Sequence, residues 1–225
     1  MVFKVNGVGL EWLGHASFKI KAYGKTIYID PYNIHSSDYA NIILITHPHY
    51  DHCSIADLLK ISKDNTIVIC PAECQSSVTK INRNIDLKIV EPKDKIVIEN
   101  IKIYVTYAYN IAKMFHPKSE KWCGYIIELG DVIIYHSGDT DIIPEMNELK
   151  EFVKKTDKFI ALLPIGGKFT MDVGDAVKAA KLIKPALAIP MHFGSIIGSI
   201  EDAKKFCNLC NNNGIRAKIL ERVQE

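Results

Sequence analysis

The stretch ILITHPHYDHCS, Ile43 to Ser54, places three histidines and an aspartate within six positions directly after an apolar run. The apolar run predicts a buried strand. Ser54-Ile-Ala-Asp57 predicts the start of a helix, because a serine followed three residues later by an acidic residue approximates a capping box. The histidines therefore occupy a loop between a strand and a helix, where ligand-binding residues commonly lie.

This loop has the coordinating groups that a metal ion requires. Imidazole and carboxylate groups at this density favour a divalent ion of the Zn, Mn or Fe type. His47 and His49 can point the same way from an extended chain, because side chains there repeat with a period of two. Asp51 and His52 follow at the turn into the helix and can face a second ion. An isolated histidine is usually a surface or core residue, but four ligating side chains within six positions are hard to explain in that way.

The order of predicted elements indicates the fold class. Short segments rich in Ile, Val and Tyr predict strands at 10–20, 25–29, 42–45, 66–70, 88–90, 95–98, 101–107, 124–129, 132–135, 159–163, 186–190 and 217–220. Helical periodicity is found at 54–62, 72–80, 142–150, 173–183 and 201–213. Hairpins early and helix-separated strands later favour an α+β fold of mixed sheets with outer helices. No linker rich in Gly, Ser or Pro divides the chain, so we expect a single domain over residues 1–225.

Composition excludes several classes of protein. The 225 residues are 48% hydrophobic and 24% charged, with a net charge of +2, which is typical of an ordinary soluble protein. We expect a small-molecule substrate rather than nucleic acid, because no strongly basic character is present. The N-terminal residues do not resemble a signal peptide, and no apolar run approaches the roughly 18 to 20 residues of a membrane span. We therefore expect a cytoplasmic protein; whether it forms a homo-oligomer stays open.

The six cysteines are too few and too irregularly spaced for a disulfide scaffold, so we expect them to be reduced. Cys207-Asn-Leu-Cys210 has the C-x-x-C spacing of metal and redox sites. It lies within a helical pattern and has no second pair to complete a zinc site. We therefore predict that both cysteines pack on a helix face.

The pattern Thr46-His-Pro-His-Tyr-Asp-His52 resembles the T-H-x-H-x-D-H signature of the metallo-β-lactamase superfamily. The segments YHSGDTD (135–141) and AIPMHFG (188–194) are similar to its bridging-aspartate and final-histidine motifs. EWLGHASFKI, IDP and LLPIGGKFTM resemble, more narrowly, the branch of ascorbate-6-phosphate lactonase-like and N-acylphosphatidylethanolamine phospholipase D-like proteins. The resemblance covers nearly the whole chain. It implies a four-layer αββα sandwich of two mixed β-sheets flanked by helices, with two metal ions at one edge.

The resemblance also implies a set of ligands from separate regions. The first ion would be held by His47 and His49, the second by Asp51, His52 and His192, and Asp139 would bridge the two. The superfamily's third histidine for the first ion is missing, because Asn110 stands at the matching place and His116 lies six residues farther on. Three alternatives stay open: His116 as the ligand, Asn110 as an amide ligand, or a weak first site completed by water.

A pair of divalent ions implies hydrolysis, because such ions lower the pKa of water toward about 7 and stabilise the charge that develops on attack. We predict a binuclear metal-dependent hydrolase of an ester, lactone or phosphoester bond, phosphodiesters included. Asp51 would orient the attacking water, and His116 would protonate the leaving group if it is not a ligand. His15, Asp30 and His136 are candidates for contacts that orient the ligands, although a core role for His15 is equally well supported.

Two other functions remain as alternatives. A redox diiron centre is one, but diiron relatives of this superfamily carry H-x-E where this chain has His47-Pro-His49. The other is a metal-binding protein with reduced catalysis, because Asn110 replaces a ligand.

Overall fold

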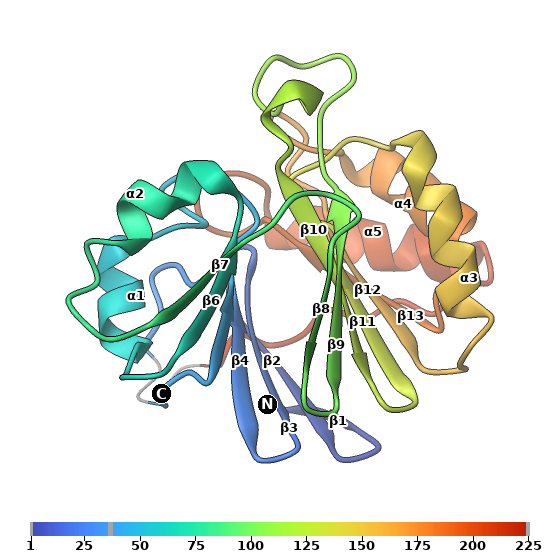
Figure 1. Ribbon diagram of the computed structural model, residues 1–225. Coiled ribbons are helices and arrows are strands. Elements are labelled where there is room, and N and C mark those ends of the chain that lie inside the picture. The colour runs from blue at the N-terminus through green and yellow to red at the C-terminus, as the bar shows by residue number, and fades with distance from the viewer. Residues whose placement is uncertain (1, 36–37, 224–225) are drawn as a thin grey trace. The chain divides into compact units, whose positions relative to one another are not determined.

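The computed structural model describes residues 2–35 and 38–223, which divide into two compact units. The first unit runs to Glu91 and includes the C-terminal residues from Leu220, and the second runs from Pro92 to Ile219. Each unit has its own mixed β-sheet with helices packed against it (Figure 1). The prediction of two mixed sheets with flanking helices is confirmed, and that of a single domain stays a prediction.

The seven strands of the first unit pair in chain order. They are β1 (Phe3–Val5), β2 (Val8–Gly14), β3 (Ser17–Ala22), β4 (Lys25–Ile29), β5 (Ile42–Leu44), β6 (Ile67–Cys70) and β7 (Asp86–Ile89). Strands β1 to β4 are antiparallel, and β4 to β7 are parallel. The change of direction follows from the connections, because tight turns join antiparallel strands and parallel pairs need crossovers of a dozen or more residues.

The core of the first unit joins its helices to the sheet. These helices are α1 (Ile55–Ile61), η1 (Ala72–Cys74) and α2 (Gln75–Val78). Leu58, Ile61 and Val78 from the helices share one buried cluster with Ile43 and Val68 of the strands. Helix α1 starts where the sequence predicts, because the Ser54 side chain accepts a hydrogen bond from the Asp57 amide. Such a cap contributes about 1 kcal/mol and fixes the end of the histidine-containing loop.

The second unit has a six-stranded sheet in the order β13-β12-β11-β10-β9-β8. Its strands are β8 (Lys95–Ile98), β9 (Ile101–Tyr107), β10 (Cys123–Leu129), β11 (Val132–His136), β12 (Phe159–Pro164) and β13 (Leu187–Met191). Its helices are η2 (Lys118–Glu120), η3 (Pro144–Leu149), α3 (Lys150–Val153), α4 (Val173–Ile183) and α5 (Ile200–Asn212). Strands β8 to β11 are antiparallel, and β11 to β13 are parallel, with α4 packed on β12 and α5 on β13.

Four predicted elements differ from the structure. The strand predicted at 10–20 is a hairpin of β2 and β3, because Gly14 and His15 both have positive φ and reverse the chain. The helix predicted at 72–80 is divided into η1 and α2, and the one at 142–150 is mostly the 3-10 helix η3. The strand predicted at 217–220 is reduced to a single bridge between Ala188 and Ala217, because the chain leaves the second unit at Ile219.

The C-x-x-C pair packs as predicted. Cys207 and Cys210 are buried on α5, and burial raises the pKa of the Cys207 thiol to about 11 and that of Cys210 to about 12. Both therefore remain protonated thiols at neutral pH. Among residues 2–35 and 38–223, no helix has both the length and the apolar character needed to cross a membrane.

Candidate metal centre

In the first unit, the predicted ligands lie at one edge of the sheet. Strands β2, β4 and β5 run in the same direction, so His15, Asp30 and His47 all follow carboxyl ends at that edge. The loop after β5 adds His49, Asp51 and His52. We call His15, Asp30, His47, His49, Asp51 and His52 the first-unit cluster.

Asp30 holds His52 in a defined orientation. Asp30 is fully buried and has φ 45, a left-handed conformation that is uncommon for residues other than glycine and is often found at functional sites. Its carboxylate accepts hydrogen bonds from the Thr46 amide (2.8 Å) and hydroxyl (2.7 Å), and it lies 2.7 Å from His52 Nδ1. An ionised carboxylate only accepts, so Nδ1 of His52 carries the proton and Nε2 keeps the lone pair that a metal ion requires.

The same carboxylate orients His47 through Thr46. The Thr46 hydroxyl donates its proton to Asp30, so it accepts from His47 Nδ1, which is 2.9 Å away. His47 Nε2 then keeps its lone pair, and it lies 2.9 Å from His49 Nδ1. Two nitrogens that are each ~2.1 Å from one tetrahedral ion would lie ~3.4 Å apart. His47 and His49 therefore face one point at close to the spacing of two ligands of the same ion.

His15 contacts a predicted ligand. Asp51 Oδ2 lies 3.0 Å from His15 Nε2 and 3.5 Å from His52 Nε2. His15 is 2% exposed and lies in the turn between β2 and β3. His15 is thus both a buried core residue and a partner of the Asp51 carboxylate, which it holds in place.

The second unit brings three loops together at the edge of its own sheet. Strands β9, β11 and β13 run in the same direction, and Asn110, Asp139 and His192 follow them. Asp139 Oδ2 lies 3.0 Å from His192 Nε2 and 3.4 Å from His116 Nε2. All four side chains are buried. We call Asn110, His116, Asp139 and His192 the second-unit cluster.

Asn110 contacts His116, the residue six positions farther along. His116 Nδ1 lies 2.9 Å from Asn110 Oδ1 and 3.1 Å from the Phe169 carbonyl oxygen. A backbone carbonyl can only accept, so Nδ1 donates, and Nε2, which faces Asp139, keeps its lone pair. No local sequence signal indicates Phe169, because it lies 53 residues from His116.

Further contacts hold the loops of the second-unit cluster. Lys113 Nζ lies 2.5 Å from Asp141 Oδ1 and 2.6 Å from the Thr170 carbonyl oxygen, which fastens the loop that carries His116. Gly166 passes against His192 so closely that a Cβ there would lie 2.9 Å from His192 Nδ1. The His136 ring accepts from the Gly138 amide and so supports the turn before Asp139.

A family model described as the beta-lactamase superfamily domain matches residues 9–192. The chain belongs to the metallo-β-lactamase superfamily. UPF0173 metal-dependent hydrolases of Thermoplasma volcanium and Thermococcus onnurineus are each 34% identical to it. The matches cover 97% and 90% of this chain and 97% and 92% of the relatives. The protein is thus a metal-dependent hydrolase of the metallo-β-lactamase superfamily, as predicted.

Solved structures give the same fold. A metal-dependent hydrolase candidate from Parabacteroides distasonis has a TM-score of 0.83 and 28% identity, covering 100% of this chain and 98% of that one. Igni18, a metallo hydrolase from Ignicoccus hospitalis, has a TM-score of 0.74 and 22% identity, with 96% of both chains covered. The diiron β-hydroxylase CmlA from Streptomyces venezuelae has a TM-score of 0.72 and 13% identity, with 97% of this chain and 53% of that chain covered. The predicted metallo-β-lactamase fold is confirmed, and the narrower lactonase-like and phospholipase D-like resemblance stays a prediction.

Proposed function

We propose that the first-unit and second-unit clusters together hold two divalent ions of the Zn, Mn or Fe type, and that the protein hydrolyses an ester, lactone or phosphoester bond of a small polar substrate. The orientation of the histidines carries this proposal. His47, His52 and His116 each donate Nδ1–H to an oxygen, so each keeps its Nε2 lone pair. Surface or core histidines have no need for such a shared arrangement.

The proposed ligands are those expected from the superfamily, with one addition. His47 and His49 would hold the first ion, Asp51, His52 and His192 the second, and Asp139 would bridge them. We assign the missing third place at the first ion to His116, because its Nδ1 donates to the Phe169 carbonyl and its Nε2 lies 3.4 Å from Asp139 Oδ2, the proposed bridging ligand. Asn110 then orients His116 and does not bind the ion itself.

When bound, the ions would supply a nucleophile from water at neutral pH and Lewis acidity toward the substrate oxygen. Asp51, held by His15, is positioned to take the proton of the attacking water. The same carboxyl group then returns the proton to the leaving oxygen as the bond to carbon or phosphorus breaks, so that protons balance over the reaction.

Hydrolysis is favoured over redox chemistry by the residues of the first-unit cluster. Imidazole at His49 stands where diiron relatives carry a carboxylate, and nitrogen-rich sites suit a Lewis-acidic ion such as Zn²⁺. The likeness to CmlA concerns the fold alone. Carbonyl esters and lactones are the first substrates to test, and phosphodiesters are the second, because the same metal chemistry serves both.

Two substitutions, one in each unit, test the proposal. We expect His49→Ala and Asp139→Ala each to lower bound metal at least tenfold and to lower hydrolysis with it, because a ligand is lost. Metal content is measured by elemental analysis, and activity with p-nitrophenyl acetate, a δ-lactone and bis-p-nitrophenyl phosphate. His35→Ala, at an exposed histidine, is the matched control. Unchanged metal content in both variants contradicts the ligand assignment, and metal-loaded protein without turnover of any of the three contradicts the substrate classes.

A further inference from the structure

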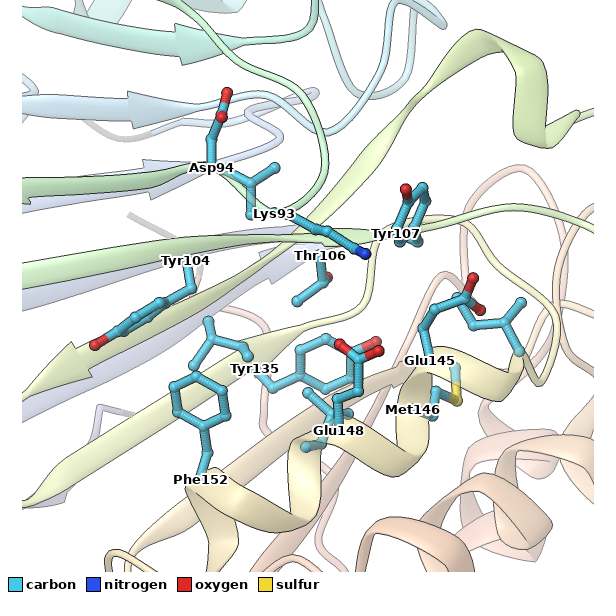
Figure 2. A pocket seen from close by; sticks show the side chains of 14 residues that line it. Lys93, Asp94, Tyr104, Thr106, Tyr107, Tyr135, Glu145, Met146, Glu148 and Phe152 are labelled. Atoms are coloured by element: carbon cyan, nitrogen blue, oxygen red, sulfur yellow. The ribbon is translucent and has the colours of Figure 1, made fainter.

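The second unit contains a cavity of about 230 Å³ that the proposed hydrolysis does not use. It lies between the face of β9 to β11 and the segment formed by η3 and α3 (Figure 2). None of its lining residues belongs to the second-unit cluster. Its volume is below the roughly 300 to 1,000 Å³ of sites for drug-sized ligands. The size therefore fits a ligand no larger than about one amino acid.

The walls of the cavity are mainly aromatic and apolar. Tyr104 and Phe152 form one end, where their rings meet edge to face with centroids 4.9 Å apart. Tyr107 and Met146 lie toward the other end of the cavity (Figure 2), and Ile126 is also among its lining residues. Paired strand residues put Tyr104, Ile126 and Tyr135 on the same face of the sheet. Such walls favour a flat ring or a branched hydrocarbon group.

Two hydroxyl groups add polarity to these walls. Tyr135 is 1% exposed, and burial raises the pKa of its hydroxyl, so that the group stays neutral. The Thr106 hydroxyl is also buried, and its hydrogen-bonding interaction with Tyr135 partly offsets the rise in the Tyr135 pKa. Few polar groups among apolar walls are what small-molecule sites use to orient a ligand.

Charged side chains line both walls of the same cavity, Lys93 and Asp94 on the strand side and Glu145 and Glu148 on the helical side. Figure 2 shows Lys93 reaching in from the strand side and Glu148 from the helical side. Neither makes an ion pair within the described part of the chain, whereas Lys118 and Glu145 pair at 2.7 Å near Tyr107. The backbone beside Lys93 is fixed, because Lys93 N donates to Val105 O at 2.8 Å. One cationic and one anionic group thus remain available to a ligand.

We propose that this cavity binds a small zwitterion with an aromatic or branched apolar side chain, such as a free hydrophobic amino acid. Its carboxylate pairs with Lys93, its ammonium group pairs with Glu148, and its side chain packs against the rings of Tyr104 and Phe152. Because both charged groups are exposed, each contact changes affinity by only about two- to fivefold, and the apolar walls provide most of the binding. The expected dissociation constant for L-phenylalanine is on the order of 1 mM.

Calorimetric titration of the full-length protein with L-phenylalanine, 3-phenylpropanoate, phenethylamine and glycine tests the proposal. L-phenylalanine should bind two- to fivefold more tightly than either analogue with a single charge, and glycine should not bind. Lys93→Met should remove the preference over phenethylamine, and Glu148→Gln the preference over 3-phenylpropanoate. Thr106→Phe, which fills the cavity, should abolish binding, and unchanged thermal unfolding shows that this variant folds.

Mapping the residues that respond to the ligand by NMR distinguishes this site from the metal centre. Amide shifts on addition of L-phenylalanine should concentrate at residues 104–107 and 145–149, and His49→Ala should bind as the wild type does. The proposal is overturned if L-phenylalanine does not bind at 10 mM, on the order of ten times the expected constant. It is also overturned if folded Thr106→Phe binds it equally well, or if both analogues with a single charge bind as tightly as the zwitterion. The outcome does not depend on the hydrolytic activity.

Discussion

The two units place their site residues at the edge of a sheet by the same means, yet they distribute them differently along the chain. In the first unit, four predicted ligands lie in one loop after β5. In the second, Asn110, Asp139 and His192 follow three different strands. The four ligands of the first unit lie close together because they are neighbours in the chain. The residues of the second unit form a cluster only when three strands align their carboxyl ends. Spacing alone therefore reveals the compact motif, whereas the members of the dispersed set are indicated only one by one, and their convergence is seen only in the folded unit.

The units also differ in how they fix the protonated nitrogen of a histidine. In the first unit the buried carboxylate of Asp30 accepts the Nδ1–H of His52 directly and orients His47 through the Thr46 hydroxyl. In the second unit the neutral oxygens of Asn110 and Phe169 accept the Nδ1–H of a single histidine, His116. Hydrogen bonds to a charged acceptor are roughly twice as strong as neutral ones. Removing the acceptor of the histidine Nδ1–H should therefore lower metal affinity more in the first unit than in the second.

The largest effect is expected for Asp30→Asn. The substitution removes the charge that orients two histidines, and loss of such a contact typically lowers metal affinity by about 10- to 100-fold. Competition with a chromogenic chelator for Zn²⁺ measures the change. Asp157→Asn is the matched control, because Asp157 is 87% exposed. Wild-type affinity in a folded Asp30→Asn protein would show that the carboxylate does not set the histidine orientation.

A smaller effect is expected for Asn110→Leu, about tenfold in metal affinity, because the Phe169 carbonyl remains as an acceptor for His116. Asn110→Asp keeps an oxygen at the same position and should recover most of the loss. Nitrogen-15 shifts of the His116 ring report which nitrogen carries the proton and are independent of activity. If Leu and Asp at position 110 weaken metal binding equally, the residue does not act through His116.

The same contrast explains what the sequence could reveal. The loop at 46–52 and the cap at Ser54 depend on neighbours in the chain, so pattern and spacing were sufficient to predict them. The resemblance indicated Asp139 and His192 singly, and each follows a strand as expected. The contact between His116 and Phe169 could not be predicted, because it depends on two loops that meet only in the folded unit. The turn at His15 was missed because its apolar neighbours resemble one continuous strand.

The final prediction concerns Asp57, which fastens the end of the first-unit loop as Lys113 and Asp141 fasten the loop in the second unit. Its buried carboxylate accepts from the Asn33 amide at 2.8 Å, the Ile34 amide at 3.2 Å and Lys60 Nζ at 2.9 Å. Burial by itself would raise the pKa of Asp57, but hydrogen bonds from Ser54, Lys60 and the two amides outweigh it and lower the pKa below 3.8. A depressed pKa in the folded state stabilises the protein above the unfolded pKa, and this contribution is lost as pH falls through the folded value.

Asp57→Asn should therefore lower the free energy of unfolding by about 2 kcal/mol at neutral pH, because an amide cannot replace an ionised acceptor. Urea unfolding at a series of pH values measures the difference between variant and wild type. The difference should be constant above about pH 5 and should narrow as pH falls below 3.8, where the wild-type carboxylate takes up a proton. Asp157→Asn should show neither effect. A difference that does not change with pH would mean that Asp57 acts through its shape and not through its charge, and only the second unit would then depend on an ion pair to hold its loop.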